Sequence, residues 1–216
     1  MIKKGIILLK RIFRSRKNTP YKNWLIVKGD ETLRLNYPLS RNSIVFDLGG
    51  YKGQWASDVY SRYLCTIYVF EPVKEFFEKI KDKFSKNSKI KVFNFGISNK
   101  TKREIIFLDE DGSSTYGRGK AQKIQLRSIN EFLNHKKIRK IDLIKINVEG
   151  EEYKILSELI KGGFVKKIKN IQVQFHTNIP NYQMKYLEIR KDLEKTHKLT
   201  YFFPFIWENW ELKNER

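Results

Sequence analysis

Short apolar runs alternate with stretches of helical periodicity along most of the chain, and this alternation is the feature that most limits its possible folds. The apolar run at residues 43–48 ends in a glycine turn, and residues 54–64 then repeat apolar side chains at helical spacing. Four further strands are expected at residues 66–70, 89–97, 141–146 and 171–175. Strands that alternate with helices predict an α/β fold, in which a mostly parallel sheet carries helices on both faces.

The remaining segments are expected to extend this pattern. They are a short strand or hairpin lead-in at 18–38, strands at 103–108 and 123–126 around a polar loop, helices at 128–134 and 186–194, and a terminal hairpin at 199–212. A length of 216 residues suits one domain better than two domains and a linker. We therefore expect a basic amphipathic helix at residues 1–20 and a single domain at residues 21–216.

The first 17 residues carry seven lysines or arginines and no acidic residue, while apolar side chains recur at helical spacing. Such a helix can bind an anionic membrane surface. An ordinary first helix packed on the domain fits the same pattern, so both interpretations stay open. No apolar run of about 18 residues occurs that could span a bilayer. We expect a cytoplasmic protein which, in the first interpretation, lies peripherally on the inner face of the membrane.

Composition narrows the partners and disfavours several kinds of site. The chain has 44 basic and 24 acidic side chains, and its net charge of +20 favours anionic partners such as nucleic acid, phospholipid or phosphorylated carriers. The single cysteine, Cys65, excludes an internal disulfide and any CxxC site. The three histidines lack the spacing of zinc ligands, so no metal is predicted.

Two acidic residues follow neighbouring predicted strands, at the edge where a parallel sheet binds ligands. Asp47 begins a turn in which Gly49, Gly50 and Gly53 would let the backbone approach a ligand, and its carboxylate would face a cationic group. Glu71 ends the next strand, where a carboxylate can accept hydrogen bonds from ribose hydroxyls. Together they predict an adenosyl ligand without a 2′-phosphate. The alternative for Glu71 is a helix N-terminal charge satisfied by nearby backbone amides.

Five segments of the chain resemble FkbM-type S-adenosylmethionine-dependent methyltransferases. They are VFDLGGYKGQW (45–55), VFEP (69–72), FGIS (95–98), GSS (112–114) and IDLIKINVEGEE (141–152). The resemblance covers about residues 43–176, most of the globular part, and implies a class I methyltransferase (Rossmann-like) fold with a seven-stranded sheet and S-adenosylmethionine as cofactor. It implies methyl transfer to a hydroxyl of a saccharide in a polysaccharide, lipopolysaccharide or glycolipid precursor. The cofactor-binding residues expected from it are Asp47, Gly49, Gly50, Gly53, Glu71, Gly96, Ser114 and Asn147.

The family usually has Lys-Ile-Asp-Val-Glu-Gly where this chain has Asn147 in place of the aspartate. An asparagine cannot accept a proton at neutral pH, so another residue would have to remove the hydroxyl proton. Glu149 and His176, each just beyond a strand end, are the candidates, and with Asn147 they form the expected catalytic set. Each also has a structural alternative, as a first-turn helix carboxylate for Glu149 and as a strand-end histidine bonded to a loop for His176.

Trp207, Glu208 and Trp210 form an aromatic and acidic cluster suited to stacking on a sugar and binding its hydroxyls, although packing on the sheet edge would also explain them. The expected acceptor is therefore a saccharide or lipid-linked saccharide. One alternative is a nucleic-acid methyltransferase, which the positive charge suits but which the absence of an Asn/Asp-Pro-Pro-aromatic turn disfavours. Another is a catalytically weakened adenosyl-binding module, for which Asn147 is the only hint.

Overall fold

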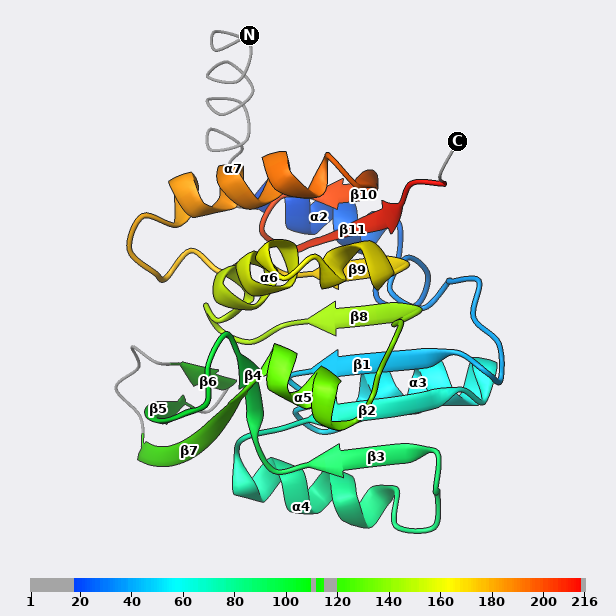
Figure 1. The fold of residues 1–216 in the computed structure, drawn as a ribbon, viewed down its shortest axis with the longest axis vertical. Coiled ribbons are helices and arrows are strands. Elements are labelled where there is room, and N and C mark those ends of the chain that lie inside the picture. Colours follow the sequence, from blue (N-terminus) through cyan, green and yellow to red (C-terminus); the bar gives the residue numbers. More distant parts are fainter. Residues whose placement is uncertain (1–17, 110–111, 115–119, 215–216) are drawn as a thin grey trace, which may run out of the picture.

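One large sheet organises the molecule, and its strands follow the predicted alternation. The computed structural model describes residues 18–109, 112–114 and 120–214. The strands of this sheet are β1 (Ile44–Leu48), β2 (Thr66–Phe70), β3 (Ile90–Phe93), β8 (Leu143–Ile146), β9 (Asn170–Val173), β10 (His197–Phe203) and β11 (Trp207–Leu212). Their order is β10-β11-β9-β8-β1-β2-β3, and β11 runs antiparallel to both its neighbours (Figure 1). The predicted mostly parallel seven-stranded sheet is confirmed.

Helices cover both faces of this sheet (Figure 1). One face packs against α5 (Ile129–His135), α6 (Glu152–Lys161) and α7 (Tyr182–Leu193), and the short 3-10 helix η1 (Phe164–Lys167) joins them. The other face packs against α3 (Gln54–Tyr63) and α4 (Lys74–Lys83), with α2 (Asn18–Ile26) beside β10. Both faces are therefore buried, which explains why the central strands are continuous apolar runs.

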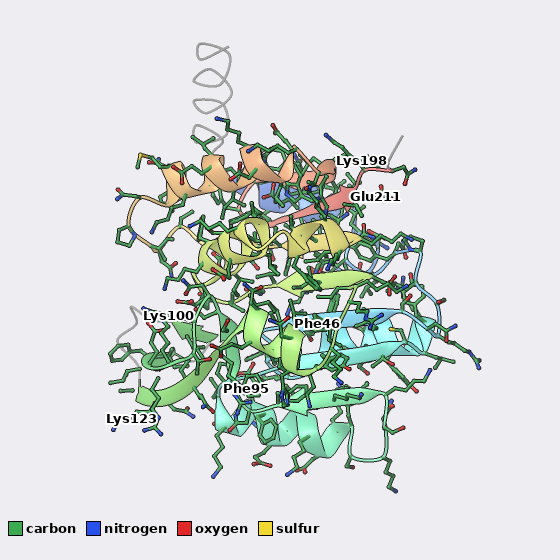
Figure 2. The ribbon with its side chains drawn as sticks, viewed as in Figure 1. Phe46, Phe95, Lys100, Lys123, Lys198 and Glu211 are labelled. Atoms are coloured by element: carbon green, nitrogen blue, oxygen red, sulfur yellow. The ribbon has the colours of Figure 1, made fainter. Side chains whose placement is uncertain are left out.

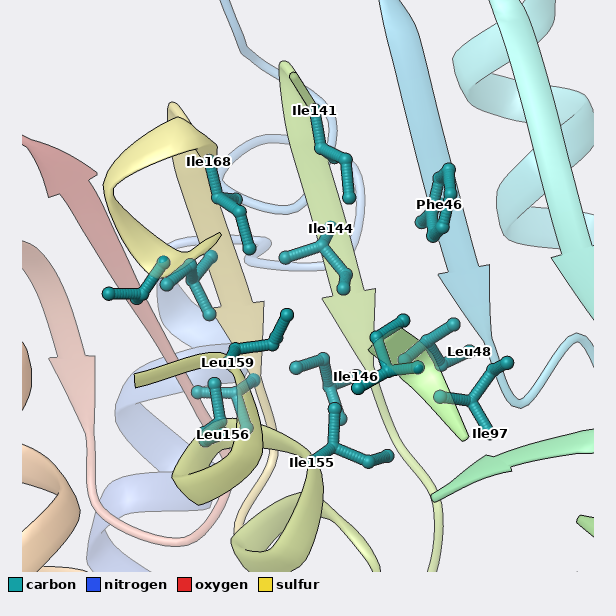
Figure 3. Packing of buried hydrophobic residues seen from close by; sticks show 14 of the residues in the cluster. Phe46, Leu48, Ile97, Ile141, Ile144, Ile146, Ile155, Leu156, Leu159 and Ile168 are labelled. Carbon is teal, nitrogen blue, oxygen red and sulfur yellow. The ribbon is translucent and has the colours of Figure 1, made fainter. Parts of the chain in front are cut away.

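Alternation along the central strands decides which side chains meet which helices. Ile144 and Ile146 of β8 point toward α6, where they pack near Ile155 and Leu156 (Figure 3). Successive side chains of a strand point to opposite faces, so Lys145 points toward α3 instead. Outside this core, charged side chains such as Lys100 and Lys123 extend into solvent, and Lys198 of β10 pairs with Glu211 of β11 at 3.0 Å (Figure 2).

A second, four-stranded sheet lies beside the edge toward which β1, β2 and β8 point (Figure 1). Its strands are β4 (Gly96–Ser98), β5 (Lys102–Asp109), β6 (Gly112–Ser114) and β7 (Lys120–Ser128), in the order β4-β7-β5-β6. The single strand predicted at 89–97 is wrong, because β3 ends at Phe93 and β4 belongs to this other sheet. Between them, the Asn94 side-chain amide donates to the backbone oxygens of Glu71 and Pro72 and fixes the change of direction.

The strand or hairpin predicted at residues 18–38 is also wrong. Residues 18–26 form α2 and the chain then continues in turns to residue 35. Trp24 anchors this segment, since it is 1% exposed and meets the ring of Phe203 edge-on at 5.1 Å. The boundary predicted at residue 20 therefore falls inside α2, while residues 1–17 of the amphipathic helix predicted at residues 1–20 lie outside the described part. Within that part, no helix is both long and apolar enough to cross a bilayer.

Candidate active site

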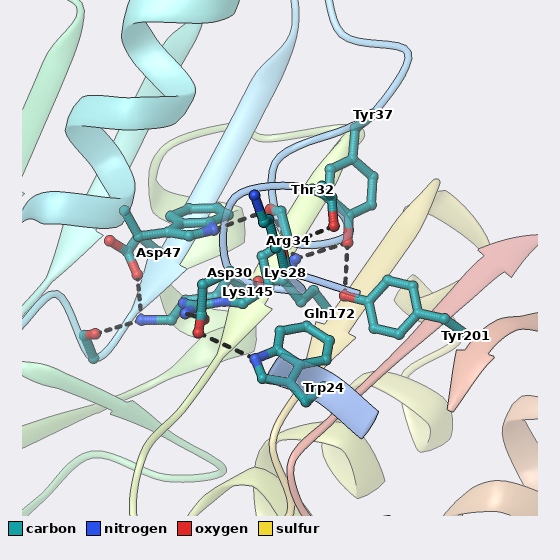
Figure 4. A network of polar contacts seen from close by, with 12 residues as sticks. Trp24, Lys28, Asp30, Thr32, Arg34, Tyr37, Asp47, Lys145, Gln172 and Tyr201 are labelled. Carbon is teal, nitrogen blue, oxygen red and sulfur yellow. Dashed lines mark hydrogen bonds and ion pairs between the residues drawn. The ribbon is translucent and has the colours of Figure 1, made fainter. Parts of the chain in front are cut away.

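The carboxylate of Asp47 is completely buried on β1 and forms an ion pair with Lys145 on the adjacent strand. Lys145 Nζ lies 2.8 Å from Asp47 Oδ1 and donates to the backbone oxygen of Gly49 at 2.6 Å (Figure 4). Burial lowers the pKa of Lys145, and the negative charge of Asp47 opposes that effect. Asp47 Oδ2 has no hydrogen-bond partner in the described structure. The site thus contains a buried carboxylate oxygen with unused acceptor positions, although Asp47 does not line the cavities described below.

The sequence predicts that the Asp47 carboxylate faces a cationic group of a ligand, but it does not predict the ion pair with Lys145. The signal was present, because Lys145 is the one basic residue within the otherwise apolar β8 strand. Strand register pairs Asp47 with Lys145 and Lys145 with Gln172, so the three side chains form one polar row beneath α3 and the preceding segment.

The glycines after β1 bring the backbone against the ends of the neighbouring strands. Gly49 has a φ of 84°, and a Cβ atom there would lie 2.0 Å from the backbone oxygen of Asn147. A Cβ at Gly50 would lie 2.4 Å from a Val69 methyl group. Gly53 forms the N-cap of α3. The backbone is therefore packed so closely at Gly49 and Gly50 that a side chain is excluded at these two positions.

Glu71 is 4% exposed and lies at the end of β2, as predicted. Its Oε2 accepts from the backbone N–H of Tyr51 at 2.7 Å, and its Oε1 accepts from that of Val73 at 2.9 Å. Burial raises its pKa to about 7, against the opposing effect of these hydrogen bonds. The structure thus shows the alternative that the sequence left open, in which nearby backbone N–H groups donate hydrogen bonds to the Glu71 carboxylate. Each carboxylate oxygen keeps a second acceptor position, so the ribose role stays a prediction.

Two cavities meet around Gly49, Glu71, Asn147 and Glu149, which line both. The larger, of about 480 Å³, extends from the glycine turn to Lys145. The smaller, of about 80 Å³, is bordered by Gly96 and by the apolar side chains Ile97, Ile106, Ile124 and Leu126 of the second sheet. A Cβ at Gly96 would lie 2.6 Å from a Leu126 methyl group, so a glycine keeps this space open. Ser114 lies on β6, and its side chain is not among those described.

A third cavity, of about 750 Å³, lies between α6, α7 and β5 and also reaches Glu149. Six carboxylates and four lysines line it: Glu104, Glu149, Glu151, Glu158, Glu188, Asp192, Lys154, Lys161, Lys185 and Lys191. No arginine occurs among these described lining residues. Glu149 therefore stands where all three cavities meet.

His176 and Glu149 are close together, as the sequence suggested. His176 Nε2 lies 3.3 Å from Glu149 Oε1, and its Nδ1 lies 3.3 Å from Oε1 of the buried Glu152. Glu152 also accepts from the backbone N–H groups of His176 at 2.7 Å and Gly150 at 2.8 Å. Burial favours neutral His176, but its hydrogen bonds to the two carboxylates, and their charges, outweigh burial and raise its pKa to about 10. At neutral pH His176 is thus an imidazolium, which cannot accept a proton.

The backbone of Glu149 has a φ of 52°, which is uncommon for a residue other than glycine. Gly150 follows with a φ of 109°. This turn connects β8 to α6 and directs the Glu149 carboxylate, 38% exposed, to the junction of the cavities. Positive φ values at such residues are typical of functional sites, where neighbouring contacts compensate for the strain.

The aromatic cluster proposed to hold a sugar lies inside the protein. Trp210 is 0%, Glu208 3% and Trp207 6% exposed, and Glu208 is paired with Arg190 at 3.1 Å. Their burial corrects the expected stacking role and leaves the alternative, packing within the sheet edge. Within the described ranges, no group of three or more His, Cys, Asp or Glu side chains is arranged to hold a metal ion.

The chain is similar to known proteins in its sequence family and in its fold. Residues 47–203 match the family model described as the methyltransferase FkbM domain. No curated protein sequence matches the chain.

Solved structures share the fold at low sequence identity. SMU.1697c from Streptococcus mutans, described as a candidate methyltransferase and solved with SAH, is 10% identical with a TM-score of 0.54, over 88% of this chain and 97% of that one. An rRNA methylase from Streptococcus thermophilus is 12% identical with a TM-score of 0.51, over 87% and 95%. A fibrillarin/Nop5p complex is 16% identical with a TM-score of 0.53, over 90% and 83%. These neighbours identify the fold as that of class I methyltransferases.

Proposed function

Because the chain belongs to the methyltransferase FkbM domain family, we propose that it moves a methyl group from S-adenosylmethionine to a hydroxyl group of a saccharide. The cofactor supplies a methyl group that is already activated by the positive charge on its sulfur. The protein then has to bind the donor, align the acceptor oxygen, exclude water and remove the hydroxyl proton.

The two cavities beneath the glycine turn fit the donor. The small apolar cavity of the second sheet would take the adenine, and Glu71, which borders both cavities, would accept from the ribose hydroxyls. The amino group at the other end would lie near Asn147, which lines both cavities, whereas Asp47 is completely buried and lines neither. The glycine turn supports this assignment, because side chains at Gly49 or Gly50 would collide with the strand ends that border the cavity.

The observation that carries the choice of acceptor is the charge of the third cavity. Its carboxylates outnumber its lysines by six to four, although the whole chain carries a net charge of +20. Carboxylates accept hydrogen bonds from hydroxyl groups, whereas they repel the phosphates of a nucleic acid. A polyhydroxylated acceptor therefore fits this cavity, and Glu149 connects it to the donor site.

Glu149 is the proposed proton acceptor. Its Oε1 lies 3.3 Å from His176 Nε2, and with the side chain 38% exposed, Oε2 would be open to an acceptor. His176, held as an imidazolium between Glu149 and Glu152, fixes the position of the Glu149 carboxylate. A proton released by a hydroxyl at the cavity junction would pass to Oε2.

Two measurements test this function. Native mass spectrometry of the purified protein should show bound S-adenosylmethionine or its demethylated product. Transfer of a labelled methyl group to cell-surface glycans should then depend on Glu149, with E149Q at least about 100-fold slower than wild type, since a general base contributes at least that much. Glu78→Gln, on α4 outside all three cavities, should retain wild-type turnover. Full turnover by E149Q would contradict the assignment of the base.

A nucleic-acid methyltransferase is the second candidate, and the observation that favours it is the charge of +20. It predicts labelled RNA or DNA in the same transfer assay and an affinity that falls steeply with salt. Labelled nucleic acid without labelled glycan would replace the saccharide proposal. A catalytically weakened module would instead bind the donor and label neither acceptor.

We also propose that a lipid-linked acceptor is met at the inner face of a membrane, by a cytoplasmic protein bound peripherally. The basic segment 1–17 precedes α2, where Leu25 and Ile26 are 53% and 78% exposed, and Val27, directly after the helix, is 43% exposed. Apolar side chains beside basic residues suit an anionic bilayer surface. Sedimentation with phosphatidylglycerol vesicles should be lost on deleting residues 1–17 and weakened in Ile26→Asp, while Met184→Asp, an exposed position on α7, should bind as wild type. Unchanged sedimentation of the deletion would refute this contact.

A further inference from the structure

Arg34 enters the donor cavity from a segment that precedes the family match at residues 47–203. The residues around it form turns after α2, and several contacts tie them to the sheet and to α3. The backbone oxygen of Arg34 accepts from Trp55 Nε1 at 3.2 Å and from Gln172 Nε2 at 3.0 Å. The segment is thus fixed to the same polar row that contains Asp47 and Lys145 (Figure 4).

The guanidinium of Arg34 is held in place and yet keeps free donors. Nη1 donates to Asp30 Oδ1 at 2.7 Å, Nε faces Gln172 Oε1 at 3.5 Å, and the guanidinium carbon lies 4.1 Å from the ring centre of Trp207. Asp30 is itself fixed, since its Oδ2 accepts from Trp24 Nε1 at 3.1 Å. A guanidinium has five N–H donors, so at least three have no hydrogen-bond partner within the described part of the chain. The side chain is 17% exposed.

The other cations of this cavity are less suited to bind an anion. Lys145 is completely buried and already engaged by Asp47 and Gly49. Lys52 is exposed to solvent, which weakens its electrostatic contribution. Arg34 is the one arginine among the described residues that line this cavity, and it combines partial burial, a fixed plane and free donors.

We propose that Arg34 binds the α-carboxylate of the donor's methionine moiety. This inference rests on the proposed function, because it assigns a group of S-adenosylmethionine to a residue of the same cavity. An arginine fork matches the two oxygens of a carboxylate, and hydrogen bonds between charged groups are about twice as strong as neutral ones. Arg34 and Lys145 both line this cavity, and the positive charge of Arg34 contributes to lowering the pKa of Lys145, after burial. A bound carboxylate would relieve the repulsion between these two charges.

Calorimetry with two ligands tests the proposal on the full chain. The product S-adenosylhomocysteine carries the carboxylate, whereas 5′-methylthioadenosine has the same adenosine without it. Arg34→Met should weaken S-adenosylhomocysteine by about 10- to 100-fold and 5′-methylthioadenosine by no more than about twofold. Arg34→Lys, which keeps the charge without the fork, should give an intermediate loss for the first ligand alone.

Arg62→Met is the matched control. Arg62 also ties the segment to α3, through Asn36 Oδ1 at 2.7 Å and the backbone oxygen of Glu31 at 2.9 Å, but it does not line the cavity. Its removal should leave both affinities unchanged. The proposal would be overturned if Arg34→Met lost affinity equally for both ligands. It would also be overturned if Arg62→Met lost as much affinity as Arg34→Met, because either result would show a merely structural role. A selective loss in Lys52→Met instead would assign the carboxylate to Lys52.

Ligand binding by the wild-type protein distinguishes a failure of the proposed function from a failure of the Arg34 assignment. If the wild-type protein binds S-adenosylhomocysteine, and Arg34→Lys and Arg34→Met both bind this ligand as tightly as wild type, only the role of Arg34 is refuted. If the wild-type protein binds neither ligand, the proposed function itself is refuted, and the Arg34 assignment with it.

Discussion

His176 should hold its proton far above the pH at which an ordinary histidine loses it. Its imidazole is 15% exposed and lies 3.3 Å from each of two carboxylates, Glu149 and Glu152. Although burial opposes protonation, these partners raise its pKa from 6.5 to about 10. The titration of its ring protons can be followed by NMR and assigned with the variant His176→Gln. We expect a midpoint near pH 10, while His197, whose pKa is lowered by burial, should stay neutral above pH 7.

The difference between the pKa of His176 in the folded and in the unfolded state makes the stability of the protein depend on pH. A rise of the pKa from 6.5 to about 10 corresponds to at most about 5 kcal/mol of stabilisation. Because the pKa is higher in the folded than in the unfolded state, this contribution is complete below pH 6.5 and is lost as the pH rises through 10. Between pH 7 and pH 9 the folded protein should lose about 2 to 3 kcal/mol of it.

Urea denaturation at pH 7 and pH 9 measures this loss. Wild type should lose about 2 to 3 kcal/mol more stability over this interval than His176→Gln, which lacks the titrating group. His135→Gln, at an exposed histidine of α5, should behave as wild type. Parallel losses in wild type and His176→Gln, or an NMR midpoint near 6.5, would refute the reasoning. His176 would then be neutral at pH 7 and would return as a candidate base.

Three further outcomes are expected. Gly49→Ala, where φ is 84° and a backbone oxygen lies 2.0 Å from the new Cβ, should lower the free energy of unfolding in urea by about 2 to 5 kcal/mol. Gly163→Ala, with a φ of 73° but open space around the new Cβ, should lower it by only about 1 to 2 kcal/mol. Equal losses in the two variants would mean that the close approach at Gly49 has no effect. Since the pKa of Glu71 is raised to about 7, its ionised fraction grows about tenfold between pH 6 and pH 8. Calorimetric affinity for S-adenosylhomocysteine should grow with it in wild type and stay flat in Glu71→Gln, and a flat profile in both would remove Glu71 from the ribose site. Lys145→Met leaves Asp47 buried without a partner and should lower the free energy of unfolding by about 3 to 5 kcal/mol, with partial recovery on adding Asp47→Asn; a stable single variant would show that the pair contributes little.

Local patterns in the sequence were sufficient for the sheet and for the acids at its edge. The apolar run TIYVF is stopped by Glu71 and Pro72, and β2 was predicted with the bounds that it has. Asp47 and Glu71 end neighbouring strands, and parallel pairing alone brings them to one edge. The alternation of apolar and polar residues did not predict the break between β3 and β4. Phe93, Phe95 and Ile97 continue the alternation of a single strand, although the chain passes from one sheet into the other between them.

Contacts between distant residues were out of reach of the same reasoning. Arg34 reaches Gln172 across 138 positions of the chain, and no local pattern announces it. The tryptophans at 207 and 210 resembled a sugar platform because composition shows the residue types but not the neighbours that cover them. The raised pKa of His176 likewise depends on Glu152, the first residue of α6, and the sequence gives no sign that the fold brings its carboxylate to His176 beyond the end of β9.

The ion pair between Asp47 and Lys145 also bears on how the central strands find their alignment. Sliding β8 by one residue along β1 would rotate Lys145 to the opposite face, among the isoleucines that meet α6, and would strand an ammonium in hydrocarbon. Asp47 would then face an apolar side chain in place of its counter-charge. Misaligned pairings of the two strands are therefore penalised twice, while an all-apolar pair would tolerate them. The buried ion pair thus also discriminates against wrong registers of β8 on β1 during assembly of the sheet.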